Sequence, residues 1–74
     1  MDDHATVTIW DAADSLGAVT TQGAGHDVWI NYTMLRGLRA EDMRPGMRVH
    51  VTYEPTPYQD GYTWIGIDVR PASP

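Results

Sequence analysis

The sequence predicts an all-β protein in which five short strands close into an antiparallel barrel. Apolar and polar residues alternate with a period of two in five segments, which is the pattern of half-buried strands. Clusters of Gly, Pro and Asp separate these segments, and no long stretch has the helical period. Five short strands with one apolar face cannot lie flat in water, and closing them into a barrel hides that face and removes the sheet edges.

The expected strands span residues 6–10, 16–20, 27–32, 47–53 and 62–69. Alternation predicts that these side chains point inward: Val7, Val19, Val28, Ile30, Val49, Val51, Ile65, Ile67 and Val69. Trp29 lies between two inward residues, so we expect it on the outer face. Strict alternation places Trp10 on the face opposite Val7, unless a β-bulge in the first strand moves it.

The length of 74 residues suits a single domain. We expect residues 5–71 to form its core and residues 72–74 to be a loose tail. The chain has no Cys and no apolar run near the roughly 20 residues that span a bilayer. Its acidic start, Met-Asp-Asp-His, is unlike a signal peptide. These features predict a cytoplasmic protein that does not contact membranes.

The charge is acidic but unevenly distributed. Ten carboxylates face five cations, all of them Arg, which gives a formal net charge of −5. Four of the five Arg lie between Arg36 and Arg48, so a basic segment sits on an acidic body. The overall charge opposes a polyanionic partner, because contacts from Lys and Arg to phosphates supply most non-specific nucleic-acid affinity. The basic segment is either a contact surface or a solvated loop.

No residue pattern indicates catalysis. His4, His26 and His50 are far apart and lack the spacing of metal ligands, so we expect surface histidines. The acids are scattered, no Gly-rich phosphate loop occurs, and neither Ser15 nor Ser73 has a base beside it in the sequence. The sequence therefore predicts a protein that is not an enzyme and uses no metal, cofactor or small-molecule substrate.

Several segments resemble the bacterial cold-shock domain. Residues 5–19 read ATVTIWDAADSLGAV, against a family pattern similar to G-x-V-K-W-F-N-x-x-K-G-F-G-F-I. Residues 27–35, DVWINYTML, match D-V-F-V-H-[FY]-S-x-[IL], and residues 43–49, MRPGMRV, match L-x-x-G-x-x-V. Residues 66–69, GIDV, fit the family's A-x-N-V loosely. The resemblance covers nearly the whole chain and implies a five-stranded barrel of the oligonucleotide-binding (OB) type.

The resemblance also implies a single-stranded RNA or DNA site on one barrel face, where bases stack on aromatic side chains. Each such stack contributes about 1–3 kcal/mol. This chain keeps the third-strand aromatics as Trp29 and Tyr32 but has Leu16 and Ala18 where the family has two Phe. Asp14 stands where the family has a Lys. A site of full family strength is therefore not expected.

Two function hypotheses remain. The first is weak single-stranded nucleic-acid binding, for which the expected site residues are Trp29, Asn31, Tyr32, Trp10, Arg36, Arg39, Arg44 and Arg48. The second is a protein-interaction adaptor that uses an apolar patch of Trp10, Leu16, Ala18 and Trp29. A third idea is mimicry of nucleic acid by an acidic barrel. The aromatics Tyr53, Tyr58, Tyr62 and Trp64 either cap one end of the barrel or form a second recognition surface.

Overall fold

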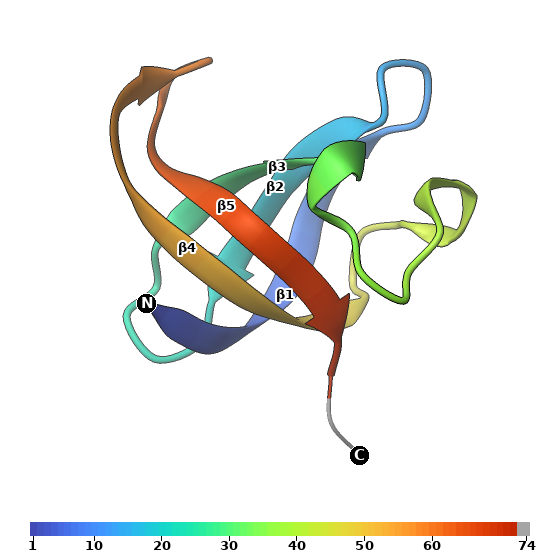
Figure 1. Ribbon diagram of the computed structural model, residues 1–74, viewed down its shortest axis with the longest axis horizontal. Coiled ribbons are helices and arrows are strands. Elements are labelled where there is room, and N and C mark those ends of the chain that lie inside the picture. Colours follow the sequence, from blue (N-terminus) through green and yellow to red (C-terminus); the bar gives the residue numbers. More distant parts are fainter. Residues whose placement is uncertain (73–74) are drawn as a thin grey trace.

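A computed structural model describes residues 1–72, so the end of the expected loose tail lies outside the described residues. The chain forms a closed barrel of five strands: β1 (Asp2–Asp11), β2 (Leu16–Thr21), β3 (Asp27–Asn31), β4 (Arg48–Gln59) and β5 (Tyr62–Pro71) (Figure 1). Two 3-10 turns, η1 (Tyr32–Met34) and η2 (Ala40–Asp42), lie in the connection between β3 and β4. The predicted all-β class and closed five-strand barrel are confirmed.

The strands follow each other around the barrel in the order β1-β2-β3-β5-β4, and β4 pairs with β1 to close it. The prediction of a wholly antiparallel barrel is wrong, because β3 and β5 are parallel neighbours. The reason is geometric. Strand directions can alternate around a closed ring only when the number of strands is even, so a ring of five needs a parallel pair. That pair is joined through a single Cα pairing, Trp29 with Ile65.

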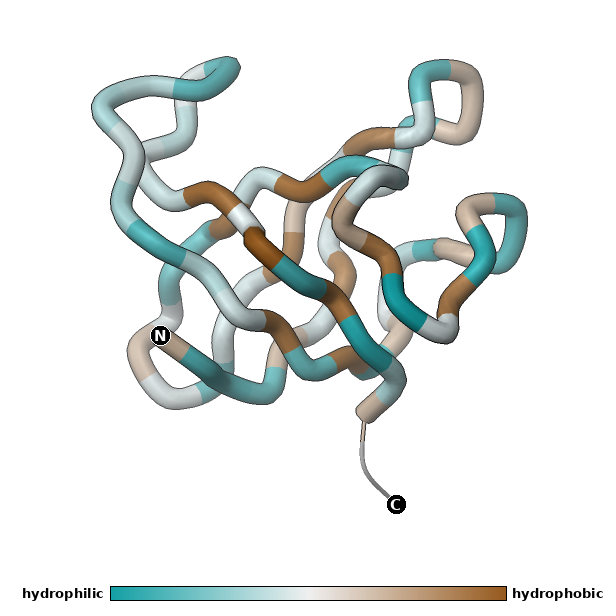
Figure 2. The backbone as a smooth tube through the Cα atoms, viewed as in Figure 1, coloured by the Kyte–Doolittle hydropathy of each residue, from teal (hydrophilic) through white to brown (hydrophobic). Residues whose placement is uncertain are grey.

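The core is built from small β-branched residues, as alternation predicts. These side chains are fully buried: Val7, Val19, Val28, Ile30, Val49, Val51 and Val69. The β-branched side chains of Val and Ile pack well on a pleated surface that is buried on one side. Hydrophobic stretches accordingly lie along the strands, while the tip of the β4–β5 hairpin is hydrophilic (Figure 2).

Ile65 and Ile67 depart from the prediction: 46% of the Ile67 surface is exposed, and Ile65 pairs with Trp29 and Glu54 on the outer side of the barrel. Thr52 pairs with Asp68 and the next residue, Tyr53, pairs with Gly66, so Ile67 is left without a partner. This bulge turns Ile67 outward and allows Tyr53, only 2% exposed, to point into the barrel. The chain between β3 and β4 adds two buried methionines that alternation did not identify, Met34 and Met43.

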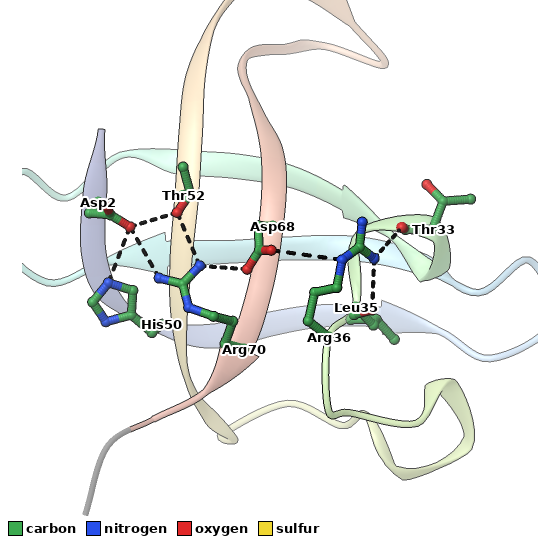
Figure 3. Close-up of polar contacts among 8 residues, drawn as sticks. All are labelled: Asp2, Thr33, Leu35, Arg36, His50, Thr52, Asp68 and Arg70. Atoms are coloured by element: carbon green, nitrogen blue, oxygen red, sulfur yellow. Dashed lines mark hydrogen bonds and ion pairs between the residues drawn. The ribbon is translucent and has the colours of Figure 1, made fainter.

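Polar side chains join the first strand to the last two. One carboxylate oxygen of Asp2 accepts hydrogen bonds from Thr52 Oγ1 at 2.6 Å and from Arg70 at 3.2 Å, and lies 3.2 Å from His50 Nε2 (Figure 3). Arg70 also donates to Asp68, whose other oxygen is 3.8 Å from Arg36. The hydrogen bond from Thr52, followed by that from Arg70, holds the pKa of Asp2 below its ordinary value. We call these four residues, Asp2, Thr52, Asp68 and Arg70, the seam network.

Candidate contact face

The outer side of β1, β2 and β3 is the face on which the sequence predicts a binding site. Strand register builds it, since Ile9 pairs with Ala18 and Ala18 pairs with Trp29. Leu16 lies two residues before Ala18 in β2 and therefore faces the same side. We call these four residues, Ile9, Leu16, Ala18 and Trp29, the apolar patch.

A bulge in β1 determines which aromatic belongs to this face. Val7 pairs with Val19 and Ile9 pairs with Ala18, so Thr8 is the extra residue. After the bulge, each side chain of β1 points to the side opposite the one that strict alternation predicts. Ile9 is therefore 55% exposed, and Trp10 packs against the core. Trp10 therefore does not belong to the apolar patch or to an exposed stacking surface, and the alternative in which a bulge moves it is the one observed.

Trp29 lies on the expected side of β3 but is not an exposed aromatic. Only 8% of its surface is accessible, and its Nε1 has no hydrogen-bond partner within residues 1–72. Its neighbours in register, Ala18 and Ile65, are apolar, and Ala18 is itself only 1% exposed. The expectation that Trp29 presents a free ring on the outer face is therefore wrong, because packing by its neighbours covers it.

Asn31 and Tyr32 lie where β3 ends. The Asn31 side-chain oxygen accepts hydrogen bonds from the Thr33 backbone N–H at 3.1 Å and from Thr33 Oγ1 at 2.6 Å, so it caps η1. Tyr32 is 59% exposed. Tyr32 is thus the accessible aromatic among the predicted site residues, and Asn31 has its acceptor oxygen committed to the turn.

The predicted cationic residues are not gathered on this face. Arg36 donates to the backbone carbonyls of Thr33 and Leu35, each at 3.0 Å, and Arg39 forms an ion pair with Glu41 at 2.6 Å. Arg44 is exposed in the loop before β4, and Arg48 pairs with Thr6 at the β1–β4 closure. The four Arg therefore surround the β3–β4 connection and the closure, not the apolar patch.

Acidic groups border the patch instead. Residues 1–31 contain five Asp and no Lys or Arg. Asp11 accepts hydrogen bonds from the backbone N–H groups of Ala13 and Asp14 and so shapes the β1–β2 turn next to Leu16. Asp27 lies two residues before Trp29, on the same side of β3. The face is apolar in the middle, with Asp11 and Asp27 at its edges and Arg48 in the same cross-strand row as Asp27, through Thr6 and Thr20.

A second concentration of aromatics lies at the other end of β3 and β5. His26 stacks on Trp64 with ring centroids 4.1 Å apart and an interplanar angle of 17°. Tyr53 meets both rings edge-on, and its hydroxyl lies 3.1 Å from His26 Nδ1. Tyr53 is thus part of the core and Trp64 packs against it, while Tyr58, on the hairpin, is 72% exposed. No sequence signal indicated that His26 would join this cluster, because it follows a Gly-rich turn outside any alternating segment.

Comparisons of the chain with protein-family models, with curated proteins and with solved structures found no match. None of the helical turns within residues 1–72 has the length and hydropathy needed to cross a lipid bilayer. Over the same residues, His, Asp and Glu do not come together in threes that could hold a metal ion.

Proposed function

We propose that this protein is a small non-enzymatic interaction module, an OB-type barrel related to the cold-shock domain, which contacts another protein through the apolar patch. The observation that carries the proposal is an exposed apolar surface with an acidic border. Ile9 is 55% exposed, and Leu16, on the neighbouring strand β2, is half-buried. The strands β1, β2 and β3 contain no Lys or Arg. Such a surface suits a partner with an apolar contact and basic surroundings.

Three features argue against a strong nucleic-acid site on the same face. Trp29 is covered, Ile9 and Leu16 offer no ring for base stacking, and the nearby acids repel phosphates. Arg36 and Arg39 are occupied by contacts within the chain.

Weak single-stranded nucleic-acid binding is the second candidate, and one observation favours it. Tyr32 is exposed at the end of β3, and the strand order β1-β2-β3-β5-β4 is the one typical of barrels that bind oligonucleotides. Binding of this kind would be centred on Tyr32, with Arg44 and Arg48 as the available cations.

Two measurements separate the candidates. In the first, wild-type protein is titrated with a short pyrimidine oligonucleotide at low salt, and tryptophan fluorescence is followed. The protein-contact proposal expects no saturable change in the wild type. It expects measurable, salt-sensitive binding in the Asp14→Lys/Leu16→Phe variant, which restores a stacking ring and removes a repulsive charge. Wild-type binding that Tyr32→Ala weakens by about 1–3 kcal/mol would instead establish the nucleic-acid function.

In the second measurement, partners captured from an extract of the source cells are compared among three proteins. The patch variant Ile9→Ser/Leu16→Ser is expected to lose the captured protein. The control Ile67→Ser, which alters an exposed isoleucine on β5 outside the patch, is expected to retain it. Equal capture by all three proteins contradicts the assignment of the patch as the contact.

A further inference from the structure

A pocket of about 350 Å³ opens between the β2–β3 turn and the β4–β5 hairpin. It is lined by Gly25, His26, Asp27, Gly61, Tyr62, Thr63 and Trp64. None of these residues belongs to the apolar patch, although Asp27 also lies at its edge.

The parallel pair of strands explains why the pocket exists. β3 and β5 both begin here and meet at one Cα pairing farther along, Trp29 with Ile65. The gap between their first residues is therefore not closed by a ladder of hydrogen bonds. Gly25 and Gly61 turn the chain at positive φ, 70° and 89°, and a Cβ built on either would meet nothing within 4 Å, so both turns border open space.

The aromatic part of the pocket is held in place from inside the barrel. His26 stacks on Trp64, and its Nδ1 is fixed by the hydroxyl of the buried Tyr53. The two pocket-lining rings are thus oriented before any ligand arrives. Preorganisation of this kind reduces the entropy that binding costs.

The polar part of the pocket includes the carboxylate of Asp27. Asp27 Oδ1 accepts a hydrogen bond from Thr20 Oγ1 at 2.7 Å, which orients the carboxylate and leaves its second oxygen available. No Arg or Lys lines the pocket, and Asp60 adds a further negative charge beside Gly61.

We propose that this pocket binds the guanidinium group of an arginine side chain presented by a peptide or protein. A guanidinium is planar and permanently charged, and its forked N–H donors match the two oxygens of a carboxylate. Aromatic rings, Trp above all, attract such a cation through their π faces. The negative charge of Asp27 and Asp60 excludes phosphates from the same place.

The test is a titration of the ¹⁵N-labelled protein with N-acetyl-arginine methylamide, followed by amide and indole NMR shifts. The expected result is saturable shifts at the Trp64 indole and at the Asp27 and Gly61 amides. N-acetyl-citrulline methylamide has nearly the same shape without the charge, and it is expected to bind at least about tenfold more weakly, since charged hydrogen bonds contribute about 1.5–3 kcal/mol.

Variants locate the site. Asp27→Asn keeps the acceptor for Thr20 and removes the charge, so it is expected to weaken arginine binding at least about tenfold. Asp11→Asn, a matched change at the β1–β2 turn, is expected to leave it unchanged. Tyr62→Phe tests the pocket without altering charge and is expected to weaken binding by a smaller factor. The proposal is overturned if no saturable shift appears, if the shifts map to another surface, or if the citrulline compound binds equally well. It is also overturned if methyl glucoside saturates the site and arginine does not.

Discussion

Burial separates side chains that look equivalent in the sequence. Ile30 is fully buried in β3, whereas Thr8, with a β-branched side chain of similar form, is the exposed extra residue of the β1 bulge. The Thr8 hydroxyl donates to the Ala18 carbonyl at 3.2 Å but sits in a solvated position. The contributions of the two residues to stability should therefore differ strongly.

Ile30→Ala is expected to lower the free energy of unfolding by about 2–5 kcal/mol, because it removes buried methylene groups and leaves a cavity. Thr8→Ala is expected to change it by about 0.5 kcal/mol. Urea denaturation followed by tryptophan fluorescence measures both. Similar shifts of the two midpoints would contradict the facing of β1 and β3.

The two bulges show how single residues redirect whole strands. In β1 the extra Thr8 turns Ile9 out and Trp10 in, and in β5 the unpaired Ile67 turns Gly66 inward and Ile65 outward. Gly17 lies opposite Trp10, and a Cβ placed on it would lie 2.0 Å from the Ile9 carbonyl oxygen. The backbones of β1 and β2 therefore approach so closely at the bulge that only a residue without a side chain fits.

Gly17→Ala is accordingly expected to destabilise the protein by about 1–3 kcal/mol, because the clash is with backbone and needs strand movement. Gly23→Ala is the control, since its Cβ would meet only a side-chain oxygen of Asp3, which can shift at the expense of its hydrogen bond from the Gly23 N–H. Thermal unfolding by circular dichroism compares the two. A Gly17→Ala midpoint no lower than that of Gly23→Ala would show that the bulge is less tightly packed than described.

Closure of the barrel joins residues from the two ends of the chain. The seam network couples Asp2 of β1 to Thr52 of β4 and Arg70 of β5 (Figure 3). Hydrogen bonds to the charged carboxylate lower the pKa of Asp2 in the folded protein, and its contact with Asp68 raises the pKa of Arg70, which stays charged. A carboxyl group whose pKa is lower in the folded than in the unfolded state adds stability above its unfolded pKa. That stability is lost as pH falls through the folded pKa.

Asp2→Asn is expected to make the stability depend less on pH as the pH falls below about 4, the ordinary pKa of an Asp, because the variant has no proton to take up at this position. Urea midpoints measured at several pH values, with Asp14→Asn as an exposed control, test this. A variant whose midpoints fall with pH as steeply as those of the wild type would mean that the seam network does not hold Asp2 in its charged form in solution.

The alternating pattern predicted the class, the strand number and most of the core, because Val28, Ile30, Val49 and Val51 follow an undisturbed period of two. It did not predict the facing of Ile9, Ile65 and Ile67, since one extra residue changes a strand's facing without changing its composition. The cover over Trp29 and the stacking of His26 on Trp64 also escaped prediction. Both depend on which residues of distant strands become neighbours, and that register is set by the whole barrel.

The position of β5 has a consequence for how the chain is made. β5 lies between β3 and β4, so a chain emerging from the ribosome cannot complete the ring until β5 itself has emerged. Until then β3 and β4 each present an open edge, and pairings such as Ala5 with Val49 must be reached across most of the chain. Open edges pair readily with other chains, and distant pairings form slowly. The period between synthesis and closure is therefore the time when this small protein is most exposed to aggregation.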